Sequence, residues 1–137
     1  MGYQSIVTEI RTAAEAVNPT GTFVHGVKPM QSLEFGSPFP QIFLDPFDST
    51  MVDNKFNVEN HSVMIAFLDQ DAPDSSVTEQ EAILAAMDAL ANQFIITFND
   101  NVGNVTQIKK QPAYRIFAGT VTGMILSFTC QTKIDLC

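Results

Sequence analysis

The sequence predicts an α+β fold: a mostly antiparallel β-sheet packed by an N-terminal helix and one long helix. Two observations predict it. Apolar residues recur at helical spacing in two segments, whereas between and after these segments they alternate with polar residues. The resulting order of helix, strands, long helix and strands favours helices on one side of an antiparallel sheet. The chain has 137 residues and no internal repeats, so we expect one domain spanning residues 1–137.

The first helix is expected from Tyr3 to Val17. Its apolar positions are spaced by three or four residues, with charged residues on the other side, and the segment "NPTG" ends it. The apolar positions are Ile6, Ile10, Ala13, Ala14 and Val17. The next segment, "TFVHGV", is expected to form a short strand.

The stretch from residue 28 to residue 54 is the least regular part of the chain. Four of the seven prolines lie between Pro29 and Pro46, and proline cannot donate to a strand ladder. Between such breaks "QIFL" is expected to form a strand. Five of the eleven phenylalanines lie between Phe35 and Phe56. This aromatic segment either folds over the core or reaches a neighbouring subunit, and the sequence leaves both readings open.

Two strand-like pieces are expected in "KFNVENHSVMIAFLDQD". The second, "SVMIAFLD", is nearly all apolar, which is typical of a central strand covered on both faces. A long helix follows from about Glu79 to Phe98. Its N-terminus has two possible capping boxes, Ser76 with Glu79 or Thr78 with Glu81.

The last part of the sequence is expected to form two or three antiparallel strands, with Gly119 and Gly123 at a bulge or sharp bend. In "MILSF" the alternation points Leu126 and Phe128 inwards. We therefore expect a core strand whose end, Ile134 to Cys137, is covered by neighbouring structure. Cys130 and Cys137 lack the spacing of a metal or redox pair, so both are expected to be free thiols.

Composition favours a subunit of an assembly. Only 16% of the residues are charged, against roughly 25% in an average domain. The alternative is a compact monomer with a neutral polar surface. The net charge of −8, with scattered basic residues, argues against gripping nucleic acid. The sequence shows no secretory signal and no apolar run that approaches a membrane span.

No residue set predicts an active site, a metal site or a cofactor site, so we expect no enzyme activity. His25 and His61 are the only histidines, and neither belongs to a paired motif. Asp69, Asp71 and Asp74 resemble the start of a calcium loop. The central glycine and the final glutamate of such a loop are missing, so a solvated turn is expected there instead.

Several stretches resemble the tail-terminator and tail-completion ring proteins of tailed bacteriophages. They are "SIVTEIRTAAEAV", "TFVHG", "PFPQIFLDPF", "HSVMIAFLDQD" and "AGTVTGMILSFTCQTKIDLC". The ring proteins in the necks of crAss-like phages look like the nearest subgroup. The likeness spans almost the whole chain, but it is one of element order and short degenerate pieces. The proline- and phenylalanine-rich loop at Phe35 to Phe47 departs from the family, which leaves the position within the neck or tail open.

The resemblance implies a structural virion protein that is assembled in the host bacterial cytoplasm. It implies a homo-oligomeric ring of six or twelve copies, stacked with other neck, portal and tail proteins, through which DNA passes without specific binding. The residues expected at the oligomer interface are Phe39, Phe43, Phe47, Ile134 and Leu136. The alternatives are a tail-tube or baseplate subunit, and a small cytoplasmic ligand-binding module.

Overall fold

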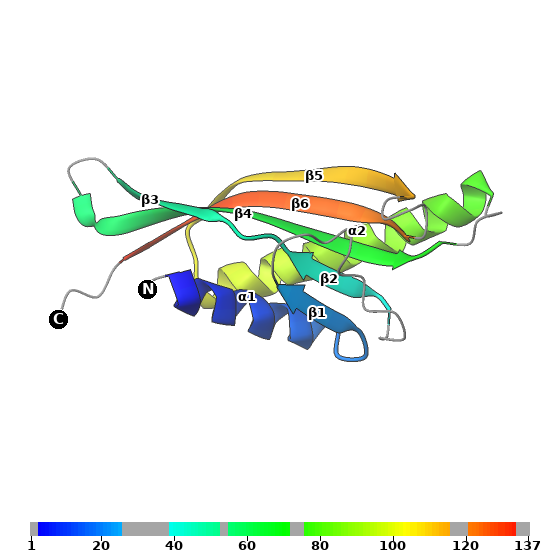
Figure 1. Ribbon diagram of the computed structural model, residues 1–137, viewed down its shortest axis with the longest axis horizontal. Coiled ribbons are helices and arrows are strands. Elements are labelled where there is room, and N and C mark those ends of the chain that lie inside the picture. The colour runs from blue at the N-terminus through cyan, green and yellow to red at the C-terminus, as the bar shows by residue number, and fades with distance from the viewer. Residues whose placement is uncertain (1–2, 26–38, 53–54, 72–75, 116–120, 134–137) are drawn as a thin grey trace.

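The structure, a computed structural model, describes residues 3–25, 39–52, 55–71, 76–115 and 121–133. Within these residues two helices lie on one face of a six-stranded, mostly antiparallel sheet, which confirms the predicted α+β class (Figure 1). The strand order is β1-β2-β4-β6-β5, and β3 also pairs with β4. The elements are α1 (Tyr3–Val17), β1 (Thr22–His25), β2 (Gln41–Leu44), β3 (Asp48–Val52), β4 (Lys55–Gln70), α2 (Val77–Asn101), β5 (Val105–Arg115) and β6 (Val121–Lys133).

Helix α1 has the predicted bounds and buries the predicted apolar side. Its C-terminal end is tied to the start of β2, because the side-chain amide of Asn18 donates to the carbonyl of Pro40 at 2.8 Å. Strand β1 then runs parallel to β2, with Thr22 opposite Gln41. This is the only parallel pair among the described strands. Gly26 and Val27, which end the predicted strand "TFVHGV", lie outside the described residues.

Strand β4 is one continuous strand of 16 residues, where the sequence predicted two pieces. It is central as predicted, since it pairs with β2, β3 and β6. The prediction that its apolar run is covered on both faces holds at Leu68, which is buried with Phe43 and Val121 on the second face, and is wrong at Met64. Val63, Ile65 and Phe67 are buried on the helix side, whereas Met64, on the other side, is 47% exposed. Strand β3, which the sequence did not predict, pairs with the first half of β4.

Helix α2 is longer than predicted, with 25 residues. Of the two possible capping boxes, the one formed by Ser76 and Glu79 is present. The Ser76 hydroxyl accepts from the Glu79 backbone amide at 3.2 Å, and the Glu79 carboxylate accepts from the Ser76 amide. These bonds satisfy amides that an uncapped helix start would leave without partners.

Strands β5 and β6 form an antiparallel pair, as the sequence predicted. The bulge lies elsewhere, between Thr106 and Lys109 of β5. Gly123 lies inside β6, opposite Leu68 of β4, and marks no bend. It is required for a different reason: a Cβ at this position would lie 1.9 Å from the carbonyl oxygen of Phe67. The other glycine of that prediction, Gly119, lies outside the described residues.

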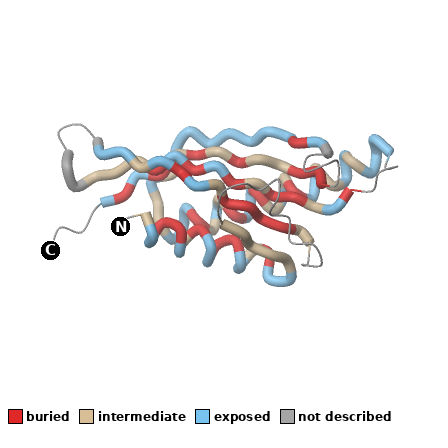
Figure 2. The backbone as a smooth tube through the Cα atoms, viewed as in Figure 1, coloured by how far each residue is buried: buried red, intermediate tan, exposed pale blue. Residues whose placement is uncertain are grey.

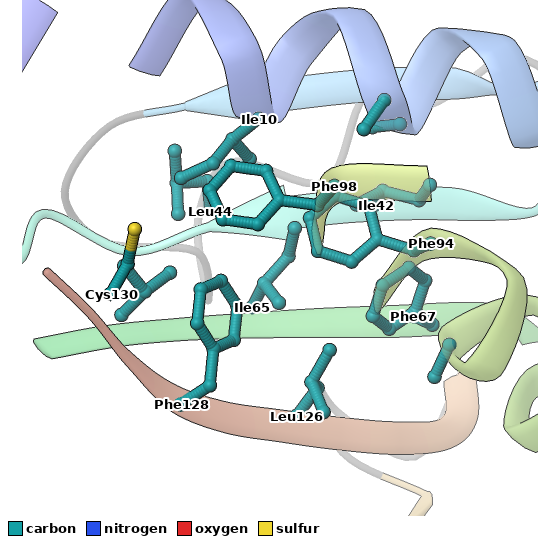
Figure 3. Packing of buried hydrophobic residues seen from close by; sticks show 14 of the residues in the cluster. Ile10, Ile42, Leu44, Ile65, Phe67, Phe94, Phe98, Leu126, Phe128 and Cys130 are labelled. Carbon is teal, nitrogen blue, oxygen red and sulfur yellow. The ribbon is translucent and has the colours of Figure 1, made fainter. Parts of the chain in front are cut away.

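The main core lies between the helices and the sheet. Figure 3 shows Phe94 and Phe98 of α2 next to Phe67 of β4 and Phe128 of β6. The ring centroids of Phe98 and Phe128 are 5.4 Å apart, and those of Phe67 and Phe94 are 5.5 Å apart. A smaller cluster of Phe43, Leu68 and Val121 lies on the opposite face of the sheet. Burial is concentrated in the central strands, while β5 is exposed along most of its length (Figure 2).

Candidate functional site

His61 is fully buried where β3, β4 and β6 meet. Its Nδ1 lies 2.6 Å from the hydroxyl of Ser49, and its Nε2 lies 2.9 Å from the hydroxyl of Thr132. Desolvation lowers the pKa of the imidazole. The Glu59 carboxylate raises this pKa and the N-terminal amino group lowers it, both with smaller effect. Because hydroxyls donate or accept, the neutral ring has a partner at each nitrogen. The arrangement joins three strands and exposes no imidazole surface to a substrate.

His25 lies at the other end of a row of four rings. Tyr3 stacks on Phe47 at 4.4 Å, His25 lies 6.5 Å from Tyr3, and His61 meets Phe47 edge-on at 6.0 Å. Burial lowers the pKa of His25, and the charge of Arg11 lowers it further. The row connects the first turn of α1 to β1, to the residue before β3 and to β4. Among the described residues, no group of three or more His, Cys, Asp or Glu side chains is placed to hold a metal ion.

Cys130 belongs to the core, and its sulfur lies between the sheet and the helices (Figure 3). Burial raises the pKa of its thiol to about 11, so the reactive thiolate is scarce at neutral pH. Cys137 lies outside the described residues.

The acidic group differs from the expected solvated turn. Asp71 is buried, and its Oδ2 accepts a hydrogen bond of 2.7 Å from the hydroxyl of Thr122. Asp69 Oδ1 accepts from the backbone amide of Gln70 at 2.8 Å, while Asp74 lies outside the described residues. The expectation is therefore wrong for Asp71, which joins the end of β4 to β6. Sequence pattern gave no sign of this, because Thr122 is 51 residues away.

The three predicted interface residues that the structure describes do not form one exposed patch. Phe43 and Phe47 are buried in the chain's own clusters, and Phe39 is half-buried beside the smaller cluster. Ile134 and Leu136 lie outside the described residues. Of the two readings of the aromatic segment, burial supports packing within the chain for Phe43 and Phe47. Their contact with a neighbouring copy stays a prediction.

Sequence reasoning missed the exposed part of the sheet face that lies opposite the helices; the other part of this face is buried around Phe43, Leu68 and Val121. Both helices lie on the opposite face, and no described helix or strand covers this one (Figure 1). Strand pairing places the following residues together on it, and we call them the open sheet face: Asp48, Thr50, Asn60, Ser62, Met64, Thr106, Lys109, Gln111, Ile125, Ser127, Thr129, Gln131 and Lys133. Three of them are charged, namely Asp48, Lys109 and Lys133, and the other ten are neutral.

Part of the open sheet face is hollowed into a shallow groove of about 410 Å³. Hydroxyl and amide side chains line it, and several of them bond to one another. Thr129 donates to Gln107 at 3.1 Å, and Gln131 donates to Asn60 at 3.1 Å. Gly103, Asn104 and Gln107, next to or at its rim, have positive φ angles. The groove offers neutral hydrogen-bonding groups and no ionisable side chain.

The outward side of α2 is a second uncovered surface. Of the helix's 25 residues, Met87, Ala91, Phe94 and Phe98 are buried. The side that points away from them is exposed, and it combines apolar residues with the polar Thr78, Asn92, Gln93 and Asp100. We call its mostly apolar middle part the α2 stripe: Ala82, Ala85, Ala86, Ala89, Gln93 and Ile96. Ile96 is 61% exposed.

By length and composition α2 would be able to cross a membrane, and it is the one such helix among the described residues. This corrects the expectation that no apolar segment approaches that length. In the fold, α2 lies against the sheet, and Lys110 of β5 forms a 2.6 Å ion pair with Asp88 and a 2.7 Å hydrogen bond to Asn92. These contacts are those of a helix in a folded α+β domain.

Charge is distributed unevenly between the two uncovered surfaces. Helix α2 carries Glu79, Glu81, Asp88 and Asp100 and has no lysine or arginine. The open sheet face carries Lys109 and Lys133 and one carboxylate, Asp48. Lys110, next to Lys109, points to the other face and pairs with Asp88.

Comparisons with known proteins add no family: no protein-family model matches the chain, and no curated protein matches it.

Proposed function

We propose that the protein is a structural subunit that assembles with copies of itself into a ring in the neck or tail of a tailed bacteriophage. The observation that carries the assembly is the α2 stripe, which places four alanines and Ile96 of a 25-residue helix on the solvent side of the single chain. Apolar side chains gathered in one exposed strip favour a surface that a partner covers. The low share of charged residues, 16%, agrees with it.

The assignment to a phage ring rests on the resemblance of several stretches to tail-terminator and tail-completion proteins. The α+β architecture is compatible with it. In the proposed role the ring joins portal and tail and lets DNA pass. An acidic chain with net charge −8 suits such a lumen, because like charges keep DNA from adhering to the wall. Six or twelve copies are proposed, together with neighbouring neck, portal and tail proteins.

Negative-stain electron microscopy of the purified protein tests this proposal. The expected result is a population of closed rings of uniform diameter with a central hole. Long tubes would instead support the tail-tube alternative, because a tube subunit stacks without limit. Featureless particles of the size of a single chain, at every protein concentration, would overturn the proposal.

A second candidate function is a small ligand-binding module, and the groove of about 410 Å³ favours it. Its lining of hydroxyl and amide groups fits a neutral ligand rich in hydroxyl groups, such as a sugar. Isothermal titration of the protein with neutral mono- and disaccharides tests this candidate. Saturable binding that is lost in Asn60→Ala would support it, and the absence of heat with every sugar would remove it.

A further inference from the structure

We infer that the open sheet face of one copy docks on the α2 stripe of the next copy, so that assembly proceeds head to tail. This inference rests on the proposed function, since it names the two surfaces through which the copies would meet. When two copies join through different surfaces, one copy keeps a free sheet face and the other keeps a free α2 stripe. Further copies can therefore be added at both ends until a ring closes.

In the middle of β4 and β6 the sheet side of the contact carries no charged side chain. On the open sheet face Met64 is 47% exposed, and Ile125 and Ser127 beside it are half-buried. Burying neutral groups avoids the several kcal/mol that removing a charge from water costs. A helix with its side chains is about 10 Å across, and strands lie about 4.8 Å apart. One helix therefore covers two neighbouring strands, such as β4 and β6.

The helix side of the contact has the matching shape and chemistry. The α2 stripe extends over 14 residue steps from Ala82 to Ile96, or about 21 Å at 1.5 Å per residue. Four of its six members are alanines, which let a helix approach a sheet closely. Docking on a sheet is also how the opposite side of α2 is already covered within its own chain. The contact would place a helix on each face of the sheet, an arrangement common in α/β folds.

Charge favours the head-to-tail contact over two copies joined through α2. Each α2 has four carboxylates and no basic residue, so two α2 helices in contact would bring like charges together. The open sheet face carries two exposed lysines, Lys109 and Lys133, and one carboxylate, Asp48. Lys109 is therefore available to Glu79, Glu81 or Asp100 of the incoming α2. Like-charge contacts are unfavourable and opposite charges steer association, so the sheet is the better partner for α2.

Two variants that each block one surface test the inference. Met64→Glu places a carboxylate on the open sheet face, and Ala89→Glu places one in the middle of the α2 stripe. Ala16→Glu is the matched control, since Ala16 is an exposed alanine on α1, away from both surfaces. Circular dichroism verifies that each variant is folded. If either fails to fold, Ser127→Glu or Ala86→Glu replaces it on the same surface.

Light scattering after size-exclusion chromatography measures the mass of each protein alone and of the two variants mixed in equal amounts. We expect Ala16→Glu to assemble as the wild type does, and each blocking variant to weaken association by about tenfold or more. We expect the mixture to form a one-to-one dimer, because each variant still carries the surface that the other lacks.

Three results would overturn the inference. If the wild type assembles and both blocking variants assemble equally well, the copies meet elsewhere, and the proposed ring survives. If only Ala89→Glu is monomeric and the mixture forms no dimer, α2 meets α2. If the wild type is monomeric at all concentrations, the proposed function fails and the inference fails with it.

Discussion

Replacing Phe128 with alanine removes the ring that joins β6 to α2, and it should be among the most destabilising single changes in the core. Phe128 is 2% exposed, and its ring centroid lies 5.4 Å from that of Phe98 and 6.3 Å from that of Phe94. Truncating a buried phenylalanine costs about 3–5 kcal/mol. Each lost aromatic pair adds about 0.5–1.5 kcal/mol beyond burial, which favours the upper end of that range.

Urea unfolding followed by circular dichroism measures this loss. All proteins are compared at one concentration, because assembly would raise the apparent stability. We expect the free energy of unfolding to fall by about 4–5 kcal/mol. The urea concentration at the midpoint should fall by this amount divided by the slope m, and m itself should not change. Tyr114→Ala on β5 is the control, since Tyr114 is 54% exposed, and we expect it to cost no more than about 1 kcal/mol. Equal costs for the two variants would refute the placement of Phe128 in the core.

Three further changes test other parts of the structure. Since the native pKa of His61 is lowered, the contribution of this group to stability should be constant above about pH 6.5 and fall below it, by up to about 1.4 kcal/mol per pH unit. Urea unfolding between pH 5 and pH 8 should therefore show a shallower loss of stability in His61→Gln than in the wild type. Equal losses in the two proteins would contradict a lowered pKa of His61. Gly123→Ala should lower the free energy of unfolding by on the order of 3 kcal/mol or more, because its Cβ would meet the Phe67 carbonyl. Gly103→Ala, where nothing lies within 4 Å and φ is +79°, should lower it by about 1–2 kcal/mol in the same assay. A larger loss for Gly103→Ala than for Gly123→Ala would be evidence against the β4–β6 register. In Cys137→Ser, iodoacetamide at pH 8 should label Cys130 in urea and not in the native protein, because burial raises the pKa of this thiol to about 11; rapid native labelling would mean that Cys130 is accessible.

The helices could be predicted from the sequence because their signals are local. In α1 the apolar residues from Ile6 to Ala14 recur every three or four residues, and the predicted bounds match the structure. For the start of α2, the sequence offered two possible capping boxes, which lie within the same six residues. Local geometry alone does not choose between them, since either serine or threonine hydroxyl can accept from an amide three residues on.

Features that depend on distant residues could not be predicted. The apolar run in β4 looked as if it were covered on both faces, because Met64 and Ala66 are as apolar as Ile65. Which face is covered depends on where the helices lie, and that is a property of the whole fold. On β6, Thr132 is 71 residues from its partner His61, and Thr122 is 51 residues from its partner Asp71. Strand β3 was missed because "DSTMV" carries little apolar alternation and pairs only along one side of β4.

The candidate surfaces were only partly visible in the sequence. The low share of charged residues predicted that some surface is covered in an assembly, but it did not say where. The α2 stripe became visible once Met87, Ala91, Phe94 and Phe98 were placed in the core, because the opposite side of the helix then faces solvent. The phenylalanines chosen from the sequence as interface residues lie partly in the chain's own core, since aromatic side chains are used for both purposes.

The most direct test of the central claim, that this chain assembles into a closed ring, is native mass spectrometry of the wild-type protein over a range of concentrations. A ring saturates all of its contacts, so it should give one dominant species at a fixed multiple, six or twelve, of the 15.0 kDa chain mass. Intermediate sizes should be scarce at high concentration. A monomer at every concentration, or a continuous series of sizes without a preferred one, would contradict the claim.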